Sequence, residues 1–278
     1  STKGGSDLGI VLTPQHITSL FCDIAEINLN SKILDTCAGT GGFLAAAWRS
    51  ILYHSSYTNK QKDDFRRNNL YGIENNRRMY TILALNMFLN KDGKTHLYFD
   101  DCFNLSEQIK KTECNVGFIN PPYSDELYSE ISFIELMLDS LLPNSIGVAI
   151  TSVNSVSNRT KKHNDVLDTK RRVLQKHSLI ASIQMPNNLF YPKGTETVIL
   201  VFRTGEKNIT DIKFFIIELL KANKKHNFIS KSTENVIWHR HILDSAQLVK
   251  FIDFSKSSLS DLGSGGGFPG LILALFNK

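Results

Sequence analysis

Residues 32–54 read KILDTCAGTGGFLAAAWRSILYH and place a glycine turn between an apolar strand and an apolar helix. The segment KILDTCAG predicts a short buried strand that ends in the turn, and GFLAAAWRSILYH predicts the helix that follows. Glycines at 39, 41 and 42 let the backbone turn tightly and approach a ligand at the helix N-terminus. A strand, a glycine turn and a helix in this order form the first half of a β-α-β unit.

The same alternation continues outward from this stretch. Further strands are predicted at residues 69–74, 95–101, 115–122, 145–152, 179–186 and 196–205, with helices at 77–90, 132–142 and 168–177. This pattern predicts an α/β, Rossmann-like fold with a mostly parallel sheet of about seven strands and a hairpin at its end. Ligands of such sheets bind at the carboxyl ends of the strands, so residues there are the first candidates for function.

Composition limits the classes of protein that remain. The chain has 278 residues, 41% of them hydrophobic, enough for one large core or for a core with a smaller attachment. No apolar run approaches the roughly 20 residues of a membrane helix, and the first residues lack the apolar centre of a signal peptide. The four cysteines form no CxxC pair, which argues against a disulfide framework or a zinc site. We therefore expect a cytoplasmic protein that uses neither membrane nor metal.

Charge is distributed unevenly along the chain. Between residues 151 and 260 there are eighteen Lys and Arg against nine Asp and Glu, and the net charge of the whole chain is +5. Solvated surface lysines explain this excess as well as a phosphate backbone does. The basic half permits a nucleic-acid partner without requiring one.

The glycine turn favours a cofactor that carries an amino acid. It lacks the Lys-Ser/Thr ending of a loop that binds nucleoside triphosphates. The negative charge of Asp35, directly before the glycines, would repel a pyrophosphate and attract an ammonium group. The predicted cofactor contacts here are Asp35, Ala38, Gly39, Thr40, Gly41 and Gly42.

Acidic residues also follow the next two strands. Glu74 ends the strand NLYGIE, where a carboxylate can accept hydrogen bonds from two ribose hydroxyls. In FDDCF, Asp101 could accept from an adenine amine and Phe103 could lie against the ring, although a helix cap explains Asp101 equally well. One acid after each of three successive strands matches S-adenosylmethionine.

The stretch FINPPYSD, residues 118–125, suggests the chemistry. Two prolines stop the strand and fix the backbone, so the side-chain oxygen of Asn120 and the main-chain oxygen of Pro121 are held in place. These oxygens could accept both N–H bonds of a planar amine and turn its lone pair towards a methyl donor. Pro122 stiffens the turn, and Tyr123 offers a face on which a base removed from a duplex could stack.

These motifs resemble the N6-adenine DNA methyltransferases in which the cofactor motif precedes the catalytic one, as in type I modification subunits. The resemblance covers about residues 9–204, and it also includes GIVLTPQHITSLFCDIA at 9–25 and MPNNLFYPKGTETVILVF at 185–202. It implies cofactor contacts from Thr13 and Pro14, and a position for Phe190 near the target base. It further implies double-stranded DNA as substrate, with a specificity subunit and a restriction subunit as partners in a restriction-modification system.

The motif Asn-Pro-Pro-Tyr leaves other substrates open. It also resembles the active site of the methyltransferases that modify a glutamine amide in release factors, although the segments LTPQHI and FYPKGTET favour DNA. A catalytically idle core that only binds DNA or a partner is a third reading. Intact Asp35, Asn120 and Tyr123 argue against it.

The last part of the sequence resembles a second family. RHILDS at 240–245 and DLGSGGGFPG at 261–270 are similar to the start of the small-subunit ribosomal RNA guanine-N7 methyltransferases, the glucose-inhibited division protein B family. We expect a catalytic core at 1–207 and a partial segment of this second family at 208–278. The segment makes rRNA methylation the alternative function. We expect its own glycine loop, with Asp261 ahead of Gly263–Gly267, to be empty of cofactor.

Overall fold

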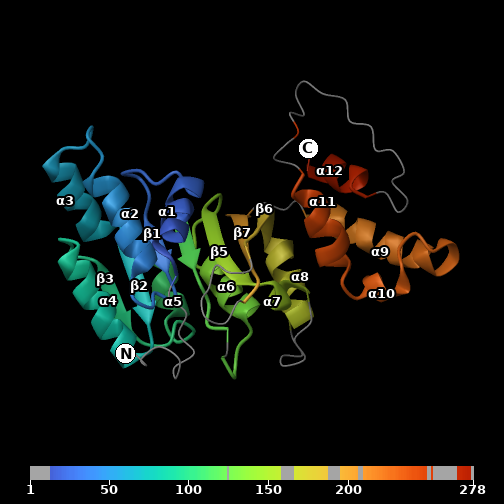
Figure 1. Ribbon diagram of the computed structural model, residues 1–278, viewed down its shortest axis with the longest axis horizontal. Coiled ribbons are helices and arrows are strands. Elements are labelled where there is room, and N and C mark those ends of the chain that lie inside the picture. Colours follow the sequence, from blue (N-terminus) through green and yellow to red (C-terminus); the bar gives the residue numbers. More distant parts are fainter. Residues whose placement is uncertain are drawn as a thin grey trace.

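The computed structural model describes residues 13–123, 125–157, 166–186, 195–205, 209–248, 252 and 268–276. Strands and helices alternate through residues 13–205, which we call the core (Figure 1). Its first half contains α1 (Gln15–Ile24), β1 (Ile33–Asp35), α2 (Gly42–Leu52), α3 (Asn59–Asn68), β2 (Leu70–Glu74), α4 (Arg77–Leu89), β3 (His96–Phe99), α5 (Ser106–Lys110) and β4 (Val116–Ile119). Its second half contains α6 (Glu130–Asp139), β5 (Ile146–Ser152), α7 (Val153–Ser157), α8 (Val166–Lys176), β6 (His177–Gln184) and β7 (Thr197–Thr204).

The seven strands form one sheet in the order β3-β2-β1-β4-β5-β7-β6. The first five are parallel to one another, whereas β7 runs antiparallel to both of its neighbours, β5 and β6. The predicted mostly parallel sheet with a terminal hairpin is therefore confirmed. Because β1 and β4 are central neighbours, the glycine turn after β1 and the Asn-Pro-Pro-Tyr turn after β4 lie side by side at the carboxyl edge.

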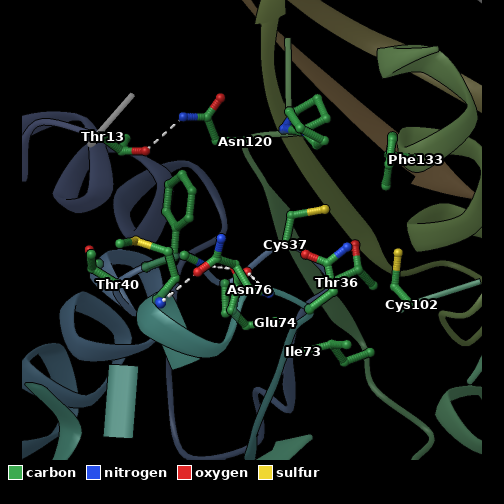
Figure 2. A pocket seen from close by; sticks show the side chains of 18 of the residues that line it. Thr13, Thr36, Cys37, Thr40, Ile73, Glu74, Asn76, Cys102, Asn120 and Phe133 are labelled. Carbon is green, nitrogen blue, oxygen red and sulfur yellow. Dashed lines mark hydrogen bonds between the residues drawn. The ribbon is translucent and has the colours of Figure 1, made fainter. Parts of the chain in front are cut away.

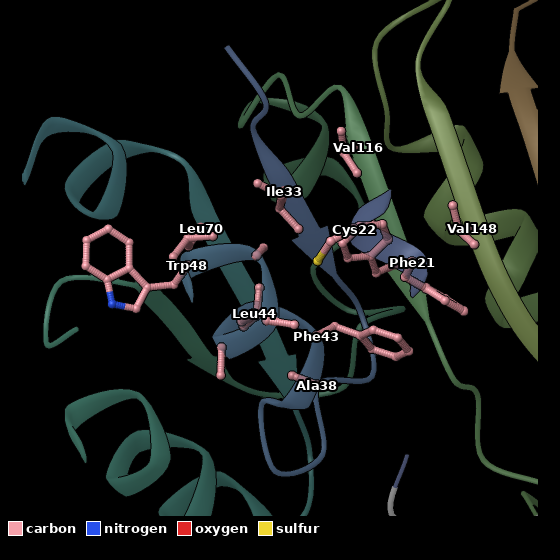
Figure 3. Packing of buried hydrophobic residues seen from close by; sticks show 14 of the residues in the cluster. Phe21, Cys22, Ile33, Ala38, Phe43, Leu44, Trp48, Leu70, Val116 and Val148 are labelled. Carbon is pink, nitrogen blue, oxygen red and sulfur yellow. The ribbon is translucent and has the colours of Figure 1, made fainter. Parts of the chain in front are cut away.

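Alternate residues of the central strands point to opposite faces and fill two hydrophobic clusters. Ile33 of β1 belongs to the cluster under α1 and α2, and the next residue, Leu34, belongs to the cluster on the other face. In the first cluster, Phe21 stacks on Phe43 with ring centroids 4.5 Å apart and meets Phe118 edge-on at 5.6 Å (Figure 3). Helix α2 is thereby fixed against the sheet directly behind the glycine turn.

The second cluster buries the opposite face of the sheet against α6 and α8. Fully buried residues of α6, among them Ile134 and Met137, pack beside Ala149 of β5 and Val173 of α8. Both faces of the parallel strands are thus covered, as expected for an all-apolar strand such as Val116–Ile119.

The described residues from 209 to 276, which we call the tail, fold as helices beside β6 and α8 (Figure 1). They comprise α9 (Ile209–His226), α10 (Lys231–Glu234), the π-helix η1 (Trp238–Leu243), α11 (Asp244–Ala246) and α12 (Gly270–Phe276). The tail has its own small cluster, which includes Leu219, Ile242 and Ile272, while Leu243 joins the second cluster of the core. The tail therefore packs on the core through apolar contacts. None of the helices that the structure describes has the length and apolar character needed to span a membrane.

Candidate active site at the carboxyl edge of the sheet

A cavity of about 290 Å³ opens where the first four parallel strands end (Figure 2). Its walls are contributed by residues that follow each strand: 36–40, 73–76, 100 with 102, and 120–123. The remaining wall residues are Thr13 before α1, Gly42 and Phe43 of α2, Met79 of α4 and Phe133 of α6. The volume lies near the lower end of the range for small-molecule sites, and the position is the one where sheets of this topology bind ligands.

The glycine turn forms one wall with its backbone. Gly41 has a positive φ of 82°, and a Cβ atom there would lie 2.5 Å from Cδ1 of Leu83. Glycine is therefore required by conformation and by space. The Nδ2 of Asn86 donates to the carbonyl oxygen of Thr40 at 2.8 Å, so helix α4 holds the turn from outside the cavity. Of the six predicted contacts in this region, Ala38, Gly39, Thr40 and Gly42 line the cavity.

Glu74 joins the glycine turn to the end of β2. Its Oε2 accepts from the backbone N–H of Gly39 at 2.8 Å, and its Oε1 accepts from that of Asn76 at 2.7 Å. Burial raises the pKa of this carboxyl, and the backbone hydrogen bonds oppose that rise. Each carboxylate oxygen keeps a lone pair, because such an oxygen can accept more than one hydrogen bond.

Asp35 lies behind the glycine turn. Its side chain is fully buried and is absent from the cavity wall; Oδ1 accepts from the backbone N–H of Cys37 at 3.2 Å. Among the described residues, Oδ2 has no hydrogen-bond partner. Burial raises the pKa of Asp35 to about 8. In this structure the carboxyl therefore stabilises the backbone of the turn from outside the cavity. The sequence had predicted a contact between this carboxyl and the ammonium group of the cofactor.

The residues after β3 that line the cavity are not the two that were predicted to do so. Asp100 and Cys102 line the cavity, whereas Asp101 and Phe103 do not. The Oδ1 of Asp101 accepts from the backbone N–H of Phe103 at 2.9 Å, a contact within its own turn. Asp101 is not a helix cap either, because Leu105 is the N-cap of α5. Phe103 packs behind the wall, with its ring centroid 5.0 Å from that of Phe133.

Asn120 faces the cavity with a defined orientation. Its Nδ2 donates to Oγ1 of Thr13 at 2.9 Å, so residues 107 apart in the chain meet across the site (Figure 2). Its Oδ1 is buried and accepts no hydrogen bond from the described residues. A buried acceptor without a donor is unfavourable, so this oxygen is suited to a ligand that brings an N–H or O–H group.

The remaining residues of this motif also line the cavity. Pro121, Pro122 and Tyr123 form its wall after β4. Burial, with a smaller contribution from the charge of Glu130, raises the pKa of Tyr123 above its ordinary value. The phenol therefore stays neutral at physiological pH and offers an uncharged ring.

The predictions for the segment before α1 and for the loop before β7 have different outcomes. Thr13 lines the cavity, whereas Pro14 caps α1, where its carbonyl oxygen accepts from the backbone N–H groups of Ile17 and Thr18. Phe190 lies outside the described residues, as do Asp261 and the tail glycines Gly263–Gly267.

Several wall residues were not predicted from the sequence. Thr36 is buried, lines the cavity, and its Oγ1 has no hydrogen-bond partner among the described residues. Asn76 caps α4 through its Oδ1, which accepts from the N–H groups of Arg78 and Met79. Their positions in the sequence were the available signal, because Thr36 directly follows β1 and Asn76 comes two residues after the end of β2. Within the described part of the chain, no group of three or more His, Cys, Asp or Glu is arranged to hold a metal ion.

Two family models match separate parts of the chain. Residues 1–137 match the family described as N-6 DNA Methylase, and residues 208–278 match rRNA small subunit methyltransferase G. Both resemblances predicted from the sequence are confirmed by these matches.

Among curated proteins, the type II restriction enzyme and methyltransferase RM.BcgI of Heyndrickxia coagulans is 30% identical over 245 residues, which cover 86% of this chain and 36% of that protein. The ribosomal RNA small subunit methyltransferase G of Pelagibacter ubique is 42% identical over 74 residues, which cover 26% of this chain and 35% of that protein. The chain therefore spans about a third of the length of each of these relatives.

Solved structures support the fold. The M protein of the type I restriction enzyme EcoKI superposes with a TM-score of 0.61 and 17% identity, over 72% of this chain and 45% of that chain. A type I modification subunit from Vibrio vulnificus YJ016 gives 0.63 and 16%, over 73% and 46%. A Listeria monocytogenes protein described as a class I S-adenosylmethionine-dependent methyltransferase gives 0.52 and 13%, over 73% and 64%. The core has the class I methyltransferase fold.

Proposed function

We propose that this chain carries the catalytic core of an N-6 DNA methylase, which transfers a methyl group from S-adenosylmethionine to N6 of adenine in DNA. The observation that carries the proposal concerns Asn120, which lines the cavity: its buried Oδ1 has no donor among the described residues, while Thr13 accepts from its Nδ2 and so orients the amide. The N-6 DNA Methylase match over residues 1–137 includes both residues.

The chain's own groups would activate the adenine amine. The lone pair of that amine is delocalised into the ring, so the nitrogen is a weak nucleophile. If Oδ1 of Asn120 and the main-chain oxygen of Pro121 accept its two N–H bonds, the nitrogen becomes tetrahedral and its lone pair points away from the ring. Both acceptors also stabilise the positive charge that develops on nitrogen during transfer. The two prolines hold them in place before the substrate arrives.

The cavity fits the proposed cofactor. The Oγ1 of Thr36, which has no hydrogen-bond partner among the described residues, can pair with a polar ligand group. Glu74 would accept from the ribose hydroxyls with the lone pairs that its backbone contacts leave free, and Asp100 would face the adenine end. S-adenosylmethionine, when bound, supplies an electrophilic methyl group on a sulfonium. Tyr123 would stack on the target base.

The two family matches support a proposed division of the chain into two functional parts. Residues 1–207 would carry methyl transfer, and 208–278 would be a partial segment of the second family that packs on the core. Two of the structural neighbours are type I modification subunits, which makes a specificity subunit and a restriction subunit the proposed partners. A cytoplasmic location agrees with this role.

One assay separates this function from its alternatives. The full chain is incubated with methyl-labelled S-adenosylmethionine and one of four acceptors: genomic DNA, small-subunit ribosomal RNA, a release factor, or none. We expect label in DNA alone, recovered as N6-methyladenine by mass spectrometry. Label in guanine of the RNA, or in glutamine of the release factor, would overturn the proposal. Asn120→Ala, with its fold confirmed by circular dichroism, is the matched inactive control.

A further inference from the structure

Glu130 is a buried acidic residue next to the candidate active site, and the proposed chemistry leaves it without a role. It is the first residue of α6, is 9% exposed and is absent from the cavity wall. Phe133, one helical turn later, lines the cavity (Figure 2). Tyr123 of the same wall is close enough that the charge of Glu130 adds to the effect of burial on its pKa. Glu130 therefore lies behind the part of the wall where the target base would stack.

The carboxylate of Glu130 accepts three hydrogen bonds at the end of β5. Its Oε2 accepts from the hydroxyl of Thr151 and from the backbone N–H of Ser152 at 2.8 Å, and its Oε1 accepts from Oγ of Ser152 at 2.7 Å. All three residues are buried. Strand β5 pairs with residues 116–119 of β4, and Asn120 follows directly. These bonds therefore join the start of α6 to the strand beside the Asn-Pro-Pro-Tyr turn.

The stability of the fold does not by itself explain a carboxylate at this position. A well-packed apolar side chain in place of a buried charge is often neutral or stabilising. Here the charge has a buried counterpart in Lys170: burial lowers the pKa of this amine to about 7, and the charge of Glu130 opposes that effect. Three hydrogen bonds are directional, whereas apolar packing is not. The carboxylate therefore adds a fixed position for the first turn of α6.

The opposite wall of the cavity is held by other contacts. The glycine turn after β1 is fixed by the hydrogen bond from the backbone N–H of Gly39 to Glu74 of β2, and by the hydrogen bond from Asn86 of α4 to Thr40. None of these residues belongs to β5 or α6. A change at Glu130 should therefore act on the wall for the target base and leave the wall for the cofactor intact.

We propose that Glu130 is a positioning residue for methyl transfer: its hydrogen bonds to Thr151 and Ser152 hold the wall formed by Tyr123 and Phe133 where the target adenine meets the methyl donor. This inference rests on the proposed function, because it adds a residue that acts on the same site. Glu130 acts through the wall residues and touches neither the amine nor the cofactor. Its effect is on geometry, and a small displacement of a reacting group is enough to slow transfer.

The experiment changes both sides of this contact. Glu130→Gln keeps the size of the side chain but replaces one acceptor oxygen by an amide N–H₂ group, which then meets a donor. Thr151→Val removes one donor with little change of shape, and Thr151→Ser retains it. Glu135→Gln is the matched control, because Glu135 lies on the same helix, pairs with Arg172 at 2.7 Å and does not line the cavity.

Two quantities are measured for each full-length variant: the affinity for S-adenosylmethionine by calorimetry, and kcat at saturating cofactor on a duplex that carries a methylation site mapped in genomic DNA. We expect Glu130→Gln to lower kcat by about 10- to 100-fold, the size of loss that a displacement of about 1 Å causes. Cofactor affinity should stay unchanged. Thr151→Val should lower kcat in the same way, Thr151→Ser should retain most of it, and Glu135→Gln should match the unaltered protein.

Several results would overturn the inference. Unchanged kcat in Thr151→Val would show that the contact does not position the wall, and this variant decides the question if Glu130→Gln fails to fold. A parallel loss of kcat and cofactor affinity, or an equal loss in Glu135→Gln, would show a general effect on the fold. No transfer to any DNA by the unaltered protein would overturn the proposed function, and the inference with it, so the two failures are distinguishable.

Discussion

Residues 35–42 of the core and residues 261–267 are both glycine-rich and both begin with an aspartate, but the described residues of the core and of the tail differ in secondary structure. The core turn follows β1 and lies against the ends of β2 and β4, which supply Glu74 and Asn120. The described residues of the tail are helical, and none of them belongs to a strand. The comparison teaches that a glycine turn provides room for a ligand, while the polar contacts come from neighbouring strands that are distant in sequence.

The largest expected effect comes from Asn120 of the core. Asn120→Ala should lower the rate of methyl transfer by about 10²- to 10³-fold, the usual loss when one preorganised polar group is removed from a transition state. Cofactor affinity should stay nearly unchanged, because the free Oδ1 is assigned to the acceptor amine. Single-turnover kinetics and calorimetry measure the two quantities separately.

Thr13→Val is the companion to this variant. It removes only the acceptor that orients the amide, and we expect a smaller loss of rate than for Asn120→Ala. Loss of cofactor binding in Asn120→Ala, with the rate of the bound enzyme preserved, would move Asn120 from the acceptor to the cofactor. The contrast between the core and the tail would then rest on cofactor contacts alone.

The second effect concerns how the tail is attached. Leu243 is buried in the second cluster of the core, so Leu243→Ala should lower the free energy of unfolding by about 2 to 4 kcal/mol. Leu248, 40% exposed in the same part of the tail, provides the control, and Leu248→Ala should change it by less than about 0.5 kcal/mol. Urea denaturation gives both values.

If the tail packed on the core only weakly, both variants would show the same small change in the free energy of unfolding. The tail would then be an independent folding unit. Unaltered cofactor affinity in Leu243→Ala is also expected, because Leu243 lies near β6 and α8, away from the strands that form the cavity. A tail that stabilises the core without serving its chemistry is the outcome that the comparison predicts.

The order of strands and helices was predictable because each one is locally consistent. The run VGFI at 116–119 is apolar at every position and is buried at every position, so its role as a central strand follows from sequence alone. Helix α3 was missed although Thr58 and Gln61 form a reciprocal capping box, because its ten residues include one buried side chain, Phe65, and give little apolar periodicity. The sequence signal for α3 was therefore its capping box and not a periodic pattern of apolar residues.

The site was predictable to within one or two residues, and the limit is geometric. The sequence shows which residues follow a strand, but not which of two neighbours turns inward. After β3 the structure places Asp100 on the wall, and Asp101 accepts a hydrogen bond from the backbone of its own turn. The hydrogen bond between Thr13 and Asn120 joins residues that only the folded sheet brings together. The antiparallel insertion of β7 between β5 and β6 likewise depends on packing across the sheet.

A third effect depends on pH and distinguishes the two aspartates. Burial raises the pKa of Asp35 to about 8, so the folded protein keeps a proton that the unfolded chain has lost at neutral pH. Because the folded state then binds more protons, this group makes stability fall as pH rises from its ordinary pKa of about 4 up to about 8. The slope is at most about 1.4 kcal/mol per pH unit.

Asp35→Asn removes this ionisation. We expect the difference in unfolding free energy between the variant and the unaltered protein to shift in favour of the variant with rising pH, and to level off above about pH 8. Asp261→Asn is the control, and its pH profile should follow that of the unaltered protein. A pH-independent difference for Asp35→Asn would show that the carboxyl is already ionised in the fold, and that an ammonium contact at this position needs no proton release.

The last prediction is that Asp261→Ala has no effect on cofactor binding, and it tests the comparison of the two glycine-rich stretches most directly. Calorimetry should find one equivalent of S-adenosylmethionine per chain, because the contacts that recognise ribose and adenine come from strand ends such as those of β2 and β3, and the described tail residues provide no strand. Glu74→Ala should weaken this binding, since it removes the carboxylate that joins the glycine turn to β2. Asp261→Ala should leave both the affinity and the stoichiometry unchanged. Two equivalents, or a single binding event that disappears in Asp261→Ala and survives in Glu74→Ala, would make the tail a working cofactor site and would move the proposed chemistry out of the core.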